Sequence, residues 1–285
     1  FAALDALIKN CTENCDEQIS DLLKEFIEIL SNGNYSPPHV SPMTITITAI
    51  ILRIPEIVSQ MAESLIMPFI SLIDVTTKPP QNFKQDEVEF DTDIWENVMI
   101  ILLHLVRFGG ASNEGIVILI INSIFNAFSI VSLNLVKNSL RCLGQLYACS
   151  PSQYMVDHLD NTFEIISYLI TVDFDEDSFS LISSIIYVYA EIFQKMGSAY
   201  INFDKNQYQE ILDSIDKAWR TEFDSATPSD LVYLYANIAH AYKCLILGFS
   251  KNKQFLVYHC RNHIFKFLEM IYNEKIFDEL LLDQI

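Results

Sequence analysis

Hydrophobic residues recur every three or four positions along almost the whole chain. Two segments show the pattern most clearly. One has Leu22, Leu23, Phe26, Ile27 and Leu30, and the other has Phe163, Ile166 and Leu169. A period near 3.6 residues is typical of helices that bury one face. The pattern therefore predicts an all-α protein.

One short stretch follows a different pattern. Residues Thr44–Thr48 alternate threonine and isoleucine, which is typical of a strand. The stretch runs directly into residues 49–54, which are apolar except for Arg53, and helical segments flank it with no second strand to pair against. We therefore expect it to be the start of a helix.

Breaks in the pattern divide the chain into pairs of helices. The expected pairs are 2–13 with 16–31, 43–53 with 55–73, 93–107 with 113–128, 133–148 with 152–171, 177–196 with 205–222, and 228–249 with 252–272. A seventh pair is expected to open at about residue 275. First helices start every roughly 40 to 50 residues, as in HEAT and armadillo arrays. The prediction is a right-handed α-solenoid of about six to seven HEAT-like antiparallel helix pairs, forming one domain over residues 1–285.

Two connections between these helices are long, Ser31–Ser41 and Ile73–Asp93, and the second contains an acidic run. Both are interpreted as surface excursions, because similar helix pairs continue on either side of each. The chain begins with Phe1 instead of methionine, so we expect it to be a fragment of a longer protein.

The composition supports a folded helical core. Of 285 residues 51% are hydrophobic, and only 7 glycines and 9 prolines interrupt the helices. The most apolar stretches, Met99–Val106 and Ile116–Phe125, are much shorter than the roughly 20 residues of a membrane span, so they are predicted to be core helices. Six cysteines lie mostly among apolar residues, which favours free thiols in a reducing compartment.

The charge pattern suggests a basic partner. With 37 acidic and 18 basic residues, the net charge of -19 repels nucleic acid and anionic lipid. Acids recur at helical spacing on two successive second helices, which line the inner wall of a HEAT superhelix. They are Asp157, Asp160 and Glu164, then Glu210, Asp213 and Asp216. We predict that these two stripes bind a Lys- or Arg-rich segment. The alternative is a solvated face that only keeps the protein soluble.

Trp219 lies three residues beyond Asp216 on the same side of its helix. Its ring could receive an arginine of the ligand, so it is included in the predicted inner-face site. The alternative is that the ring packs between neighbouring units.

Motifs for catalysis are not found. The glycine pair Gly109-Gly110 lacks the lysine of a phosphate-binding loop, and no cysteine or serine stands in a recognisable nucleophile motif. We therefore predict a protein that is not an enzyme and needs no cofactor. His259 and His263 are four residues apart and could share a metal, but we interpret them as exposed histidines beside Arg261 and expect no metal.

A resemblance to a known family lies in residues 1–14, 22–30, 139–147, 158–160 and 186–197. These segments resemble successive units of importin-β, the founding karyopherin-β nuclear transport receptor. The likeness is to the carboxy-terminal half of that family and extends over the whole chain. It implies an acidic inner surface that wraps the basic importin-β-binding segment of an adaptor. It also implies crevices on the outer face for Phe-Gly nucleoporins, control by the GTPase Ran through repeats outside this chain, and a location in cytoplasm, nucleus and nuclear envelope.

The nucleoporin crevices are expected between adjacent first helices, at Leu181, Ile185, Tyr189, Leu234 and Tyr235. A second reading of the chain stays open at this point. It could be a HEAT or armadillo scaffold of another kind, such as a trafficking coat, a formin regulatory region or a phosphatase scaffold.

Overall fold

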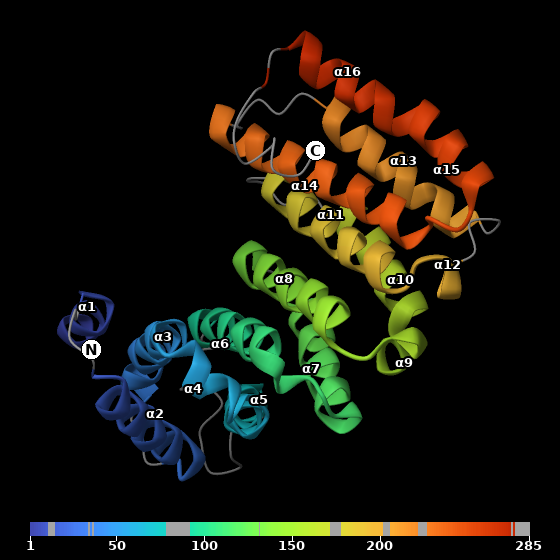
Figure 1. The fold of residues 1–285 in the computed structure, drawn as a ribbon. Coiled ribbons are helices and arrows are strands. Elements are labelled where there is room, and N and C mark those ends of the chain that lie inside the picture. The colour runs from blue at the N-terminus through green and yellow to red at the C-terminus, as the bar shows by residue number, and fades with distance from the viewer. Residues whose placement is uncertain are drawn as a thin grey trace. The chain divides into compact units, whose positions relative to one another are not determined.

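The computed structural model describes residues 1–10, 15–33, 35, 37–77, 92–130, 132–171, 178–201, 206–221, 227–274 and 276. Within these residues every regular element is a helix (Figure 1). The chain forms two compact units, Phe1–Ser150 and Pro151–Ile285.

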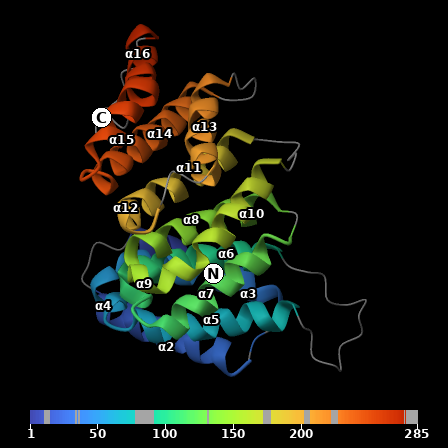
Figure 2. The ribbon, with the colours of Figure 1, turned by 90° about the vertical axis from the view of Figure 1, so that its right-hand side faces the viewer.

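The first unit consists of two layers of helices. Its elements are α1 (Ala2–Asn10), α2 (Asp16–Ser31), α3 (Pro37–Arg53), α4 (Pro55–Ser59), α5 (Ala62–Thr77), α6 (Thr92–Leu105), the π-helical turn η1 (Val106–Gly110), α7 (Glu114–Ala127) and α8 (Leu133–Cys149). The first helices α3, α6 and α8 pack side by side, and the second helices α2, α5 and α7 form the other layer (Figures 1 and 2). This is the arrangement expected of stacked helix pairs.

The second unit continues the same alternation. Its elements are α9 (Ser152–Met155), the 3-10 turn η2 (Val156–His158), α10 (Leu159–Thr171), α11 (Ser178–Lys195), α12 (Gly197–Tyr200), α13 (Asn206–Arg220), α14 (Pro228–Gly248), α15 (Lys253–His259), the π-helical turn η3 (Cys260–Ile264) and α16 (Phe265–Asn273). The first helices α11 and α14 pack along each other, and α13 packs against both. Helices α15 to α16 form the second helix of the last pair.

Two glycines allow a close backbone contact in this unit. Gly197 starts α12 with a φ of +44°, and a Cβ on it would meet the backbone of Gly248. A Cβ on Gly248 would overlap the carbonyl oxygen of Phe193 at the end of α11. Because glycine has no Cβ, the end of α14 can lie directly on the turn between α11 and α12.

The threonine-rich stretch at 44–48 is helical, as predicted, and lies inside α3. The hydroxyls of Thr44, Thr46 and Thr48 donate to carbonyls three or four residues back, at 2.8, 3.1 and 3.0 Å. These bonds satisfy the hydroxyl groups within the helix, while Ile47 and Ile50 are fully buried. Burial of the isoleucines outweighs their preference for strands.

Some of the predicted boundaries are wrong. The helix predicted over 55–73 is divided into α4, which ends at Ser59, and α5, which begins at Ala62. Helix α3 begins at Pro37 instead of residue 43, so the connection after Ser31 is shorter than expected. Pro37 and Pro38 occupy the first turn, where a backbone N–H has no helical partner and a proline costs nothing. Helix α5 runs on to Thr77 instead of ending at 73. Residues 78–91, which hold the acidic run except for Asp93, lie outside the described residues.

The apolar stretches at 99–106 and 116–125 belong to the core, as predicted. Met99, Leu102 and Val106 are fully buried in the first, and Val117 and Ile121 in the second. In the described ranges, no helix has both the length and the apolar character needed to cross a membrane.

The division at Ser150 falls between the two helices of the predicted fourth pair. Neighbouring repeats of one array and separately folding domains can both form compact units, so the single domain over 1–285 stays a prediction. The seventh pair predicted from about 275 lies, apart from Ile276, outside the described residues.

Candidate functional site

Five of the six predicted acids are exposed on two successive second helices. Asp157 lies in η2, and Asp160 and Glu164 follow on α10. Glu210 and Asp213 are exposed on α13, the second helix of the next pair. The structure therefore presents acidic groups on both helices in the same unit, and Asp216 alone differs.

A groove lies between these two helices. Its volume is about 170 Å³, and its lining comes from α10, α11 and α13: Phe163, Ser167, Ile170, Tyr189, Glu210, Ile211 and Ser214. Tyr189 is only 2% exposed, and its ring lies 6.2 Å from that of Phe163, centroid to centroid. The groove thus joins an apolar interior to a carboxylate.

Electrostatics make this groove suitable for a cation. Burial raises the pKa of Tyr189, and the negative charge of Glu210 raises it further, so the phenol stays protonated and neutral. The side chains of lysine and arginine combine an apolar stem with a charged end. A groove with aromatic side chains and the Glu210 carboxylate in its lining can contact both parts at once.

Asp216 faces the protein interior instead of the ligand. Oδ1 accepts hydrogen bonds from the Tyr242 hydroxyl at 2.7 Å and from Trp219 Nε1 at 3.4 Å. Oδ2 accepts from His263 Nδ1 at 2.8 Å and from Arg220 at 3.2 Å. The residue is 9% exposed and joins α13 to α14 and η3. We call these five side chains the Asp216 cluster.

The cluster keeps Asp216 ionised. Burial alone would raise its pKa, but hydrogen bonds from His263 and Tyr242, with the charges of His263 and Arg220, lower the pKa below its ordinary value. A carboxylate with all its acceptor positions engaged has little left for a peptide. The assignment of Asp216 to the ligand-binding stripe is therefore corrected to a role in packing the last helix pairs together.

Trp219 belongs to the same cluster. Its ring packs against Phe267 of α16 with 6.0 Å between centroids, and the guanidinium of Arg220 lies 4.6 Å from the ring centre. The intramolecular arginine takes the position proposed for a ligand arginine. The structure shows the packing alternative for Trp219.

The two histidines of the last helix pair are buried, which corrects the expectation that they are exposed. His259 and His263 are 4% and 7% exposed. Their rings stack with centroids 5.2 Å apart, and His259 also contacts Phe255. The sequence could have predicted this burial. His259, His263, Phe267 and Ile271 are spaced four residues apart, so they fall on one helix face, and that face is buried. In the described part of the chain, no group of three or more His, Cys, Asp or Glu has the geometry of a metal site.

The buried His259 predicts a pH dependence of stability. Burial first, and then the charge of His263, lowers its pKa to about 4. As the pH falls from about 6.5 to about 4, the unfolded chain binds a proton here that the folded chain does not, so the free energy of unfolding should fall by up to about 3 kcal/mol. Urea titrations across this range should show a flatter dependence for His259→Gln. His39→Gln, an exposed control, should keep the wild-type slope. A wild-type slope in the His259 variant would contradict the prediction.

The residues predicted to bind nucleoporins lie mostly in the core. Leu181, Ile185 and Tyr189 on α11 are 3%, 2% and 2% exposed, and Leu234 on α14 is fully buried. Tyr235 is partly exposed, with its ring 6.2 Å from that of Phe267. Leu181, Ile185 and Leu234 are therefore core residues and line no open crevice between first helices. Tyr189 instead contacts Phe163 of the second helix α10 and lines the groove described above.

A set of polar contacts between α11 and α14 was not predicted. Asn237 donates to Ser183 at 2.6 Å, His240 contacts Glu191 at 3.3 Å, and Cys244 contacts Gln194 at 3.4 Å. Hydrogen bonds with Cys244 and then Glu191 raise the pKa of His240 to about 10. The partners are 49 to 54 residues apart in the chain, so no local pattern reveals them.

Comparisons with known proteins identify the fold. A solved structure of a designed armadillo repeat protein in complex with the peptide (KR)4 aligns with 86% of this chain and 90% of its own, with a TM-score of 0.50 and 11% identity. The fold is of the armadillo type. This confirms the predicted class, an all-α solenoid of helix pairs. An engineered protein and another designed armadillo repeat protein align at TM-scores of 0.45 and 0.44, with 13% and 14% identity, over 99% and 85% of this chain and 93% and 90% of theirs.

Comparison of the sequence with families and with curated proteins finds no match.

Proposed function

We propose that this protein binds a Lys- or Arg-rich segment of another protein along the second helices of the Pro151–Ile285 unit, and that it acts by binding instead of catalysis. The observation that carries the proposal is the groove between α10 and α13 with exposed acids on both helices. Asp157, Asp160 and Glu164 belong to η2 and α10, and Glu210 and Asp213 to α13. Glu210 lines the groove itself. Trp219 and Asp216 are not part of the proposed contact surface.

Two further facts support a basic ligand. The net charge of -19 draws a cationic segment toward the protein and repels nucleic acid. The designed armadillo repeat protein that shares the fold was solved with the alternating peptide (KR)4. An extended basic peptide can lay its charged side chains along the acids of successive repeats and its stems in the groove.

The finer proposal is a nuclear transport receptor similar to importin-β. In it the basic segment belongs to an adaptor or a cargo, Ran acts mainly through repeats outside this chain, and the protein moves between cytoplasm and nucleus at the nuclear envelope. The acidic surface supports the first part of this proposal. Binding of Phe-Gly nucleoporins would need crevices other than the buried positions 181, 185, 189 and 234. The second candidate is a HEAT or armadillo scaffold of another kind, such as a coat, a formin regulatory region or a phosphatase scaffold, which the shared fold supports equally well.

Charge reversal tests the groove directly. Asp160→Lys combined with Asp213→Lys should weaken binding of a (KR)4 peptide by about 100-fold or more, because each partly desolvated carboxylate–guanidinium pair contributes about 1.5 to 3 kcal/mol. Calorimetric titration at low and at physiological salt measures the loss. Added salt should weaken the wild-type complex more than the reversed variant.

The matched control is Glu25→Lys with Glu28→Lys, two exposed acids on α2 in the other unit. It changes the net charge equally but leaves the groove intact, so it should cost less than about tenfold, as expected for long-range charge effects alone. Equal losses in the two double variants would mean that the acids supply only a general negative field, and the groove would no longer be the binding site.

A further inference from the structure

The outward face of the last described helix has the opposite character from the rest of the protein. Residues Phe249–Leu268 contain four cations, Lys251, Lys253, Arg261 and Lys266, and no acid, in a chain with twice as many acids as bases. All four cations are exposed. Within the described residues, no carboxylate forms an ion pair with any of them.

The same face exposes large apolar side chains. Val257, Tyr258 and Phe265 are 70%, 58% and 61% exposed. The opposite side of the helix packs into the core of its own unit. Its buried residues are His259, His263, Phe267 and Ile271. A helix that is apolar on two faces is typical of an inner layer, with a partner on each side.

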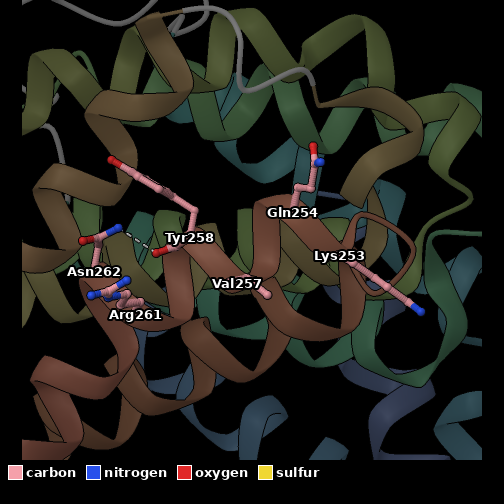
Figure 3. A pocket seen from close by; sticks show the side chains of 6 residues that line it. All are labelled: Lys253, Gln254, Val257, Tyr258, Arg261 and Asn262. Atoms are coloured by element: carbon pink, nitrogen blue, oxygen red, sulfur yellow. Dashed lines mark hydrogen bonds between the residues drawn. The ribbon is translucent and has the colours of Figure 1, made fainter.

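Four of these side chains, Lys253, Val257, Tyr258 and Arg261, line an open depression. It has a volume of about 690 Å³ and is formed by Lys253, Gln254, Val257, Tyr258, Arg261 and Asn262, which lie along α15 and η3 (Figure 3). Asn262 donates a hydrogen bond to the carbonyl oxygen of Tyr258 at 2.9 Å, so its side chain is held at the π-helical turn. Lys253 and Arg261 place a cation toward each end of an apolar centre.

We propose that this face, defined by the six lining residues together with Phe265 and Lys266, docks an acidic amphipathic helix of another protein. Charge complementarity selects the partner: glutamates or aspartates meet Lys253, Arg261 and Lys266, and leucine-like side chains cover Val257 and Tyr258. One amphipathic helix would pack against the exposed face of another, and the cations of this chain would select the charge of the partner. The surface is separate from the groove between α10 and α13 and takes a ligand of the opposite charge.

An anionic membrane would offer the same charges, but the fit is poorer. A bilayer is an extended anionic surface that reaches beyond the patch, and the net charge of -19 of the chain as a whole repels it. A short helix touches only the patch, and charges beyond about 8 Å are screened at physiological salt. The local cations therefore favour the peptide.

The experiment uses the full chain and a helical probe peptide in which leucine repeats every three or four positions and glutamate fills the rest. Fluorescence anisotropy should show saturable binding that weakens about tenfold or more in Lys253→Glu with Arg261→Glu, and also in Val257→Asp. The control Lys243→Glu with Lys217→Glu changes two exposed cations of α14 and α13 and should retain wild-type affinity within about threefold. A peptide with lysine in place of glutamate should not compete for this face.

Two results would overturn the proposal directly: no saturable binding of the acidic probe, or equal losses of probe affinity in the patch and control variants. Three other results would overturn it by identifying a different occupant. Binding to phosphatidylserine vesicles without peptide binding indicates a membrane. A concentration-dependent dimer that Arg261→Glu dissolves indicates a second copy. A marked gain in probe affinity from Leu280→Asp with Leu281→Asp indicates the chain's own residues 277–285.

Discussion

Replacing Asp216 with alanine should lower the free energy of unfolding by about 3 to 5 kcal/mol, one of the two largest effects expected from a single substitution in this chain. The carboxylate accepts from Tyr242, Trp219, His263 and Arg220, so its removal leaves the buried Tyr242 and His263 without their acceptor. Urea unfolding at neutral pH measures the loss. Asp216→Asn keeps the shape but not the charge, and it should recover only part of the stability.

The control for this substitution is Asp160→Ala. Asp160 is exposed, so its removal should change the free energy of unfolding by no more than about 0.5 kcal/mol. The pH dependence gives a second readout. The pKa of Asp216 is lowered in the folded state, so its contribution is complete above the ordinary value of 3.8 and disappears as the pH falls through the folded value. If Asp216→Ala is as stable as Asp160→Ala, the cluster does not hold the last helix pairs together.

Gly248→Ala should cost about 3 kcal/mol or more. The added Cβ would overlap the carbonyl oxygen of Phe193, which is backbone and cannot rotate away. The end of α14 would therefore have to move off the turn between α11 and α12, with loss of the packing there. Thermal and urea unfolding of the variant give the cost.

Gly33→Ala provides the comparison. Gly33 has a φ of +65°, but nothing lies within 4 Å of the position that a Cβ would take. Its substitution carries only the strain of a left-handed backbone, about 1 to 2 kcal/mol. If Gly248→Ala lowers the free energy of unfolding no more than Gly33→Ala does, the contact between Gly248 and Phe193 is not as tight as described.

The fold was largely predictable because its signal is local. Helix formation follows the 3.6-residue period, and breaks such as Asn113 and Thr227 are helix N-caps whose side chains accept from backbone N–H groups. The start of α3 was predicted at residue 43 instead of Pro37. Prolines such as Pro37 and Pro38 occur both in loops and in the first turns of helices, so they do not separate the two. Thr44–Thr48 was predicted correctly because a strand without a partner cannot satisfy its backbone.

The site was only partly predictable because charge spacing does not reveal which side of a helix is covered. Spacing of three or four placed Asp213 and Asp216 in one stripe, yet Asp213 is exposed and Asp216 is buried. What separates them is Tyr242 and His263, which approach from 26 and 47 residues further along the chain. The prediction that Leu181 and Leu234 bind nucleoporins was wrong for a related reason. A single sequence does not show which apolar face of a helix packs against the neighbouring repeat.

The polar contacts between α11 and α14 also determine how this part of the array responds to mechanical load. Asn237, His240 and Cys244 each meet a different partner, so sliding one helix by a turn would break all three contacts together. The two helices therefore resist sliding along each other, because a buried polar group that loses its hydrogen-bond partner costs free energy. When the protein is stretched or bent, we therefore expect α11 and α14 to move together as a rigid pair. The deformation should occur at other helix–helix contacts of the chain.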